Sequence, residues 1–136
     1  MGTSLQATLQ QSLQSMPDGV AAGYVDLSTG TLLGIFAWEE RPQEFLNAMA
    51  AAVTELMEAP LFRVIDKIWS KQLSEENLAK DGFGEVLLFG ADYTALLKRC
   101  QKHERHAVIY VARKDTPPGV LLMQVRSSLP AVEASV

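Results

Sequence analysis

Apolar residues at the start of the chain recur every three or four positions, which is the spacing of one face of a helix. They are Leu5, Leu9, Leu13 and Met16. Pro17 and the Asp-Gly pair after it end this helix, because proline cannot continue it and Asp-Gly favours a turn. Two segments of strand-like composition follow, residues 20–27 and 31–38, with a short polar turn between them. They predict a β-hairpin in which Gly30 adopts a positive φ.

The second half of the chain is expected to add further strands and a final helix. Residues 85–89 and 106–112 are apolar runs with β-forming side chains, and each predicts a strand. The segment 93–100 fits either a strand or a short helix, and propensity does not separate the two. Apolar residues then recur at helical spacing from Leu121, and we expect that helix to stop near Pro130.

The helix predicted over residues 42–59 is the most informative element. On a helical wheel its apolar side chains cover a continuous arc of roughly 200°, whereas a helix packed on one sheet needs about 100° or a little more. Either the helix is buried on both sides within its own monomer, or it packs on its own sheet and also on a partner. We favour the partner, and we place the surplus on the flank that holds Ala50 and Met57.

A second amphipathic helix is predicted after Pro60, over about 61–72, and we expect its polar residues to point outward. These are Arg63, Asp66, Lys67 and Ser70. Residues 72–81 are polar and predict a linker or a loose turn of helix. Neither segment interrupts the pattern strongly enough to mark a domain boundary, so residues 1–136 are expected to form one domain.

Composition agrees with an ordinary domain that has its own core. The chain has 136 residues, of which 48% are hydrophobic and 21% charged. Its single cysteine excludes an intramolecular disulfide, and no apolar run approaches the ~20 residues that a membrane span needs. No signal-peptide pattern is visible, so we expect a cytoplasmic protein without a membrane span.

Charge is unevenly distributed along the chain. The formal net charge is −4, yet the first 97 residues carry 13 acidic and 5 basic side chains, and the remainder 3 acidic and 7 basic. An acidic whole argues against nucleic-acid binding, which needs a basic face. The basic side chains around the last predicted strand either dock an acidic partner or belong to a solvated turn, which we favour. They are Lys98, Arg99, Lys102, Arg105, Arg113 and Lys114.

The sequence contains no pattern that assembles an active site. It has no glycine-rich phosphate loop followed by Lys-Ser/Thr, so we expect no nucleotide binding by the chain itself. Cys100, His103 and His106 have the residue types of a metal site, but a strand through His106 would splay them apart. Nothing visible orients His103 to activate Cys100 as a nucleophile. We therefore expect no catalytic residue, no metal and no cofactor.

Several short motifs occur in a definite order over nearly the whole chain. They are Met16-Pro17-Asp18-Gly19-Val20, Tyr24-Val25-Asp26, Gly30-Thr31-Leu32-Leu33, Ala48-Met49-Ala50-Ala51-Ala52, Glu85-Val86-Leu87-Leu88 and Leu122-Met123-Gln124-Val125-Arg126-Ser127-Ser128-Leu129. In order and spacing these motifs and the predicted elements resemble the roadblock (dynein light-chain) family. The extra helix and linker over residues 61–82 are longer than the usual connection in that family.

The resemblance implies an α/β (α+β) fold, in which a five-stranded antiparallel sheet is flanked by helices in a profilin-like, roadblock architecture. It favours the strand for residues 93–100. It also implies a homodimer or heterodimer through the middle helix and the third strand, which agrees with the wide apolar arc. The interface residues would be Leu46, Ala50, Val53, Met57, Glu85 and Leu87.

Members of the family are scaffolds or regulators of small Ras-like GTPases and motor complexes, without catalysis of their own. The function expected is therefore a non-enzymatic dimeric adaptor or regulator of a small GTPase or a related complex. The partner-binding residues would lie on the exposed side of the middle helix, and its glutamates would favour a basic partner surface. They are Asn47, Thr54, Glu55 and Glu58. The alternative is a small-molecule-sensing α/β domain with a pocket beneath Trp38 or Trp69.

Overall fold

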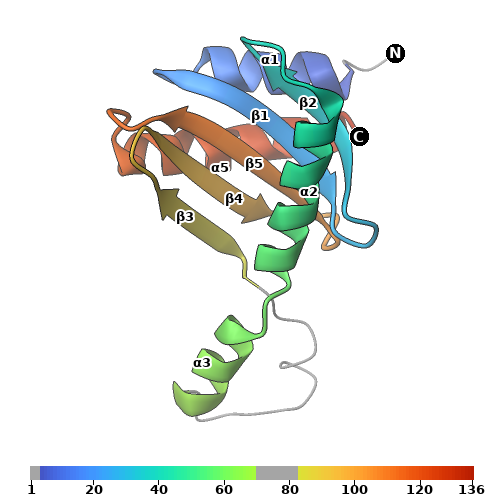
Figure 1. Cartoon of the computed structure of the whole chain (residues 1–136), viewed down its shortest axis with the longest axis vertical. Coiled ribbons are helices and arrows are strands. Elements are labelled where there is room, and N and C mark those ends of the chain that lie inside the picture. Colours follow the sequence, from blue (N-terminus) through green and yellow to red (C-terminus); the bar gives the residue numbers. More distant parts are fainter. Residues whose placement is uncertain (1–3, 70–82) are drawn as a thin grey trace.

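Five antiparallel strands form one sheet, and helices lie on both of its faces (Figure 1). The computed structural model describes residues 4–69 and 83–136. The strands lie in the order β2-β1-β5-β4-β3, so that β2 and β3 are the two edges. In chain order the described elements are α1 (Leu5–Gln14), β1 (Gly19–Asp26), β2 (Thr31–Ala37), α2 (Gln43–Met57), α3 (Leu61–Trp69), β3 (Glu85–Phe89), β4 (Tyr93–Arg99), β5 (His106–Arg113) and α5 (Pro118–Ala134).

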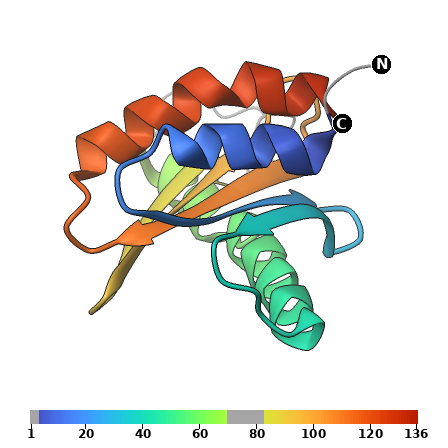
Figure 2. The ribbon, with the colours of Figure 1, turned by 90° about the horizontal axis from the view of Figure 1, so that it is seen from above.

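Helices α1 and α5 lie side by side over one face of the sheet (Figure 2). Alternate strand residues point to this face, and they include Tyr24, Leu96 and Tyr110. Together with Leu9 and Leu121 from the two helices, they belong to the larger of two buried clusters. This layer is a closed core.

Helix α2 lies on the opposite face of the sheet (Figure 2). It packs on a second buried cluster of strand and loop residues, namely Val25, Leu27, Leu97, Ala107 and Ile109. The helix does not cover the whole face. Leu88 pairs with Ala95, which packs against this cluster, yet Leu88 remains 43% exposed and Tyr93 47% exposed. An apolar part of the sheet beside α2 is therefore open.

Backbone conformation explains the two turns that frame β1. Asp18 adopts a φ of 56° just before the strand, and Gly30 adopts a φ of 70° between β1 and β2. Both values lie in the left-handed region, which glycine enters without a steric cost and Asp tolerates better than most residues. The positive φ predicted at Gly30 is confirmed.

In the second half of the chain one open alternative is settled and one expectation changes. Residues 93–99 form a strand, β4, which is the choice that the resemblance favours. Helix α5 does not stop near Pro130 but continues to Ala134. Proline removes only one helical hydrogen bond so close to the end, and burial of Val132 and Glu133 holds the last turn in place.

The predicted extra helix is present as α3, which ends at Trp69 among the described residues. Its expected continuation to residue 72 and the polar linker predicted over 72–81 lie outside them.

Candidate functional site

Three of the predicted interface residues on α2 face the chain's own sheet. Ala50 and Met57 have no exposed surface and Val53 only 4%, and all three belong to the cluster beneath α2. Their assignment to a dimer interface is therefore wrong, because the monomer's core already covers these side chains. The part of the apolar arc that the monomer's core does not use therefore lies on the other flank from the one predicted.

The exposed flank of that arc lies on the other side of the helix. Phe45 is 62% exposed, and Ala48 and Ala52 are also exposed. At about 100° per residue these three stand roughly opposite Thr54 and Ala50 on the wheel. We call Phe45, Ala48 and Ala52 the free flank of α2. It is apolar, and nothing in the described part of the chain buries it.

The other predicted interface residues also make contacts within the chain. Leu46 is half-buried and lines a hollow of about 290 Å³ with Ile35 and Phe36. Leu87 packs against the cluster beneath α1 and α5. Glu85 receives two hydrogen bonds of 2.8 Å from Arg126 and lies 3.6 Å from Nζ of Lys98. The side chains of Glu85 and Leu87 are thus engaged, whereas the outer backbone edge of β3 has no strand partner among residues 4–69 and 83–136.

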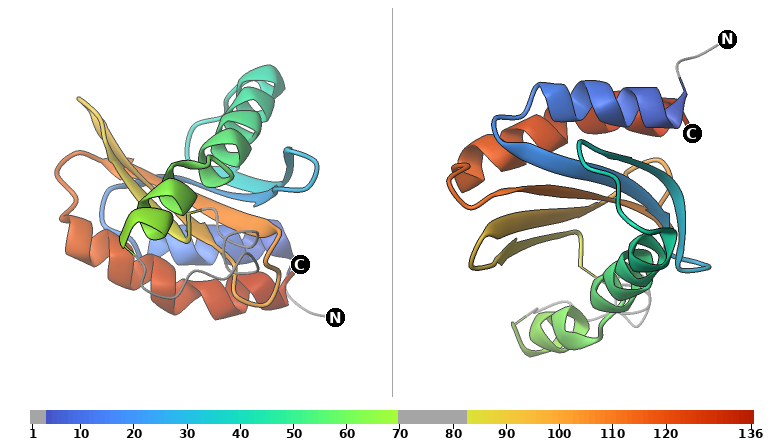
Figure 3. Two further views of the ribbon diagram at one scale, coloured as in Figure 1. Left: turned by 90° about the horizontal axis from the view of Figure 1, so that it is seen from below. Right: turned by 45° about the horizontal axis from the view of Figure 1, so that its top comes forward.

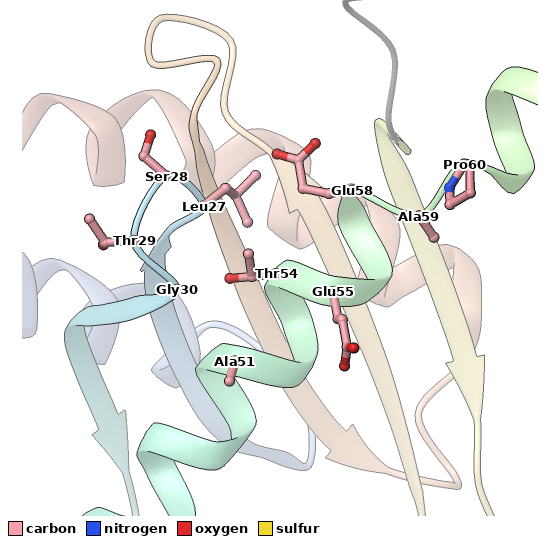
Figure 4. Close-up of a pocket in the computed structure, with 10 residues that line it drawn as sticks. All are labelled: Leu27, Ser28, Thr29, Gly30, Ala51, Thr54, Glu55, Glu58, Ala59 and Pro60. Carbon is pink, nitrogen blue, oxygen red and sulfur yellow. The ribbon is translucent and has the colours of Figure 1, made fainter.

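Three of the four predicted partner-binding residues come together in one cleft (Figure 4). Thr54, Glu55 and Glu58 line an open cleft of about 710 Å³ beside the turn between β1 and β2, with Thr54 pointing toward that turn and Glu55 projecting away from it (Figure 4). Asn47 is not among the residues that line it, and its side chain accepts a hydrogen bond of 2.9 Å from Gln43. The cleft joins the last turns of α2 to the hairpin.

The two glutamates of this cleft differ in what they can offer a partner. Oε1 of Glu58 lies 2.8 Å from Nη1 of Arg105 and 3.7 Å from Nη1 of Arg99, so its charge is balanced within the chain. Glu55 is exposed and takes part in none of the ion pairs of the described residues. It is the carboxylate available to a basic partner, and the expectation for Glu58 has to be corrected accordingly.

Several of the predicted basic docking residues also have internal partners. Arg99 donates to the backbone oxygens of Met57, Phe83 and Glu104, at 3.1, 3.2 and 2.9 Å. Arg105 pairs with Glu58, and Lys98 with Glu85. The solvated turn was the preferred interpretation of these residues, but three of the six instead make contacts that support the fold.

Helix α3 shows its apolar face to solvent. Leu61, Phe62, Val64, Ile65, Ile68 and Trp69 are between 39% and 74% exposed, and no residue of the helix is buried. Arg63 and Asp66, which were expected to point outward, are half-buried instead. An aromatic contact joins the helix to the segment just before β3, since the ring centroids of Phe62 and Phe83 lie 5.7 Å apart.

Cys100, His103 and His106, the candidate metal-binding and nucleophilic residues, do not form a reactive site. The rings of His103 and His106 stack with centroids 4.9 Å apart, so these two are not splayed as expected, while Cys100 is buried. His106 Nδ1 lies 2.8 Å from the hydroxyl of Tyr24. Burial raises the pKa of the Cys100 thiol to about 12, which keeps it protonated and a poor nucleophile. Within the described ranges no three His, Cys, Asp or Glu side chains are placed to hold a metal ion.

Among the described helices, none combines the length and the apolar character needed to cross a bilayer.

Comparisons with known proteins were made for both sequence and structure. No protein-family model matches the sequence, and no curated protein matches it either. Solved structures do match. The Roadblock/LC7 domain from Streptomyces avermitilis is 12% identical, with a TM-score of 0.71 over 97% of each chain.

Two further solved structures are similar over nearly the whole chain. The gliding protein MglB from Thermus thermophilus is 16% identical, with a TM-score of 0.71 over 96% of this chain and 87% of that one. An MglB with a tetrameric arrangement is 15% identical, with a TM-score of 0.71 over 97% and 90%. At such identities the likeness shows the fold, and that fold is the five-stranded antiparallel sheet flanked by helices that the resemblance implied.

Proposed function

We propose that this chain is a non-enzymatic adaptor or regulator that acts as a homodimer with a small Ras-like GTPase. The observation that carries the proposal is the exposed apolar surface on the α2 side of the sheet. It combines the free flank of α2 with Leu88 and Tyr93 on the sheet. Apolar side chains left exposed on one side of a soluble protein mark a candidate interaction site. The roadblock fold and the tetrameric arrangement of one similar protein support self-association.

The dimer would form about a two-fold axis that passes beside β3. This strand is an edge, and pairing it with its own copy in antiparallel fashion would satisfy the outer backbone groups of both. The free flank stands roughly opposite Ala50, which faces the sheet, so it points away from the sheet and is open to a helix of the second copy. Ala48 and Ala52 are small enough to let a partner helix approach closely.

The GTPase would meet the other side of α2, at the cleft beside the hairpin. Glu55 gives this cleft an available negative charge, and a basic surface on the partner would be attracted to it. The chain itself carries no phosphate-binding loop, so the nucleotide would stay with the partner.

Among the described residues, neither tryptophan lines the cleft beside the hairpin or the hollow at Leu46, which does not favour the small-molecule sensor. Trp38 is 53% exposed and Trp69 74% exposed, so neither tryptophan covers a pocket in the way that function would require.

The test is binding to purified small Ras-like GTPases, loaded with GTP or GDP, measured by association kinetics at several salt concentrations. The variant Glu55→Lys reverses the available charge, and Glu44→Lys is the matched control because Glu44 is an exposed glutamate in the first turn of the same helix. We expect association about tenfold slower for Glu55→Lys at low salt, a smaller difference at high salt, and no change for Glu44→Lys. Equal rates for both variants, or no GTPase binding at all, would contradict the proposal.

A further inference from the structure

Helix α3 has a continuous apolar face that the described residues leave largely exposed. Its six apolar residues occupy an arc of about 160° at 100° per residue, with Arg63, Asp66 and Lys67 on the remaining side. A nine-residue helix with this exposed face is not stable by itself in water, because short helices depend on tertiary packing. Something must cover the apolar face.

The position of α3 relative to β3 is defined at one end of the strand. The backbone N–H of Phe83 donates to the carbonyl oxygen of Met57 at 3.0 Å, and the ring of Phe83 contacts that of Phe62. Figures 1 and 3 show α3 beyond the end of α2, at the end of the sheet where β3 begins. The helix therefore lies near Glu85 and away from Phe89.

A second apolar surface lies at the opposite end of β3. Leu88 and Phe89 close the strand and Tyr93 opens the next one, with exposed fractions of 43%, 68% and 47%. Leu88 and Tyr93 are on the α2 side of the sheet. At about 3.4 Å per residue, the four steps from Glu85 to Phe89 separate this hairpin tip from the start of the strand by roughly 14 Å. The chain's own α3 is thus held at the wrong end of the strand to cover it.

Two-fold symmetry brings these surfaces together. When two copies of an edge strand pair antiparallel, the beginning of one strand lies beside the end of the other. An element fixed at Glu85 of one copy then lies beside Phe89 of the second copy, and both α3 helices meet the opposite hairpin tips at once. A nine-residue helix is about 13 Å long, which is enough to span such a tip.

We propose that α3 of each copy docks on the β3–β4 hairpin of a second copy and covers Leu88 and Tyr93 with its apolar face. This inference rests on the proposed dimer and adds a reciprocal arm to it. The extra helix then enlarges the dimer interface, and the surface that it contacts belongs to a second copy of this chain.

The test mixes two single-cysteine variants, Ile68→Cys on α3 and Leu88→Cys on β3, under mild oxidation. A disulfide between the two variants joins different copies by construction. Ile68 and Leu88 are both exposed, so neither change disturbs the core, and the native Cys100 is buried and is controlled for by the unmodified protein. The matched control mixes Ile68→Cys with Met123→Cys, because Met123 is exposed on α5 at the opposite face of the sheet.

We expect the Ile68→Cys and Leu88→Cys mixture to give at least tenfold more crosslinked dimer than the control mixture. Sedimentation equilibrium of the unmodified chain tests the dimer separately. A dimer without this crosslink would overturn the docking of α3 and leave the dimer standing, whereas a species of 14.9 kDa alone would overturn both. A third outcome is that no crosslink forms and the chain binds anionic phospholipid vesicles, with binding lost in an Ile68→Glu variant. This would overturn the docking of α3 on a second copy and assign α3 to a membrane surface.

Discussion

Arg126 donates two hydrogen bonds of 2.8 Å, from Nε and Nη2, to the two carboxylate oxygens of Glu85. This paired contact connects α5, on one face of the sheet, to the edge strand β3. The hydrogen bonds from Arg126 hold the pKa of Glu85 below its ordinary value, with a further contribution from the charge of Lys98. A residue that the sequence placed at a dimer interface is thus already fully engaged within its own chain.

The stability that Glu85 contributes should depend on pH. Because its pKa is lower in the folded than in the unfolded chain, the contribution is present above the unfolded pKa and is lost as the pH falls through the folded pKa. We expect Glu85→Gln to unfold at lower urea concentration than the unmodified protein at pH 7, and at nearly the same concentration at strongly acidic pH. The effect should be small and reduced by salt, because Arg126 is largely exposed. An equal penalty at both pH values would contradict this.

The buried hydrogen bond between Ser12 and Tyr110 should be measurable by a double-mutant cycle. The two hydroxyl oxygens lie 2.7 Å apart, and that of Ser12 also donates to the backbone of Leu9 at 2.8 Å. Tyr110→Phe removes one partner and leaves Ser12 satisfied, so we expect a loss of about 1 kcal/mol in the free energy of unfolding. The interaction energy between the two side chains, obtained by combining Tyr110→Phe with Ser12→Ala, should be of similar size. A coupling near zero would show that the bond does not join α1 to the sheet in solution.

A charge at position 50 should prevent folding, whereas the same charge one residue later should not. Ala50 has no exposed surface, so Ala50→Glu would bury an unpaired carboxylate and cost about 3–5 kcal/mol or more. Ala51 is exposed on the same helix, and Ala51→Glu should leave the thermal midpoint within a few degrees. Circular dichroism during heating measures both. A folded Ala50→Glu protein would show that position 50 is not buried in the core.

The Cys100 thiol should react slowly with Ellman's reagent in the native protein at pH 8. It is buried, and burial raises its pKa to about 12, so almost no thiolate is present. In guanidinium chloride the thiol should react at the rate of a free cysteine, which serves as the control. Rapid reaction of the folded protein would contradict this and show that the Cys100 thiol is accessible and reactive.

Local signals in the sequence were sufficient for several elements, whereas the five-stranded sheet was implied by the family resemblance. The strand predicted over residues 85–89 has those bounds in the structure, and the hairpin with its turn at Gly30 is also present. These features depend on side-chain alternation and on backbone conformation, which neighbouring residues determine.

The orientation of α2 was beyond such signals. A wheel shows how wide an apolar arc is but not which part of it faces the sheet. The core uses Ala50, Val53 and Met57, while Phe45 stays outside. The exposure of α3 escaped prediction for the same reason, since the inward direction of a helix is decided by elements far away in sequence.

Met57, the last residue of α2, and Phe83, just before β3, are joined by one backbone hydrogen bond. The guanidinium of Arg99 donates to the carbonyl oxygens of both residues. The connection between them therefore begins and ends at one closed point. The entropy of closing such a loop grows only logarithmically, by about 0.6 kcal/mol for each doubling of its length. Segments of very different length can thus be accommodated at this position while the sheet remains unchanged.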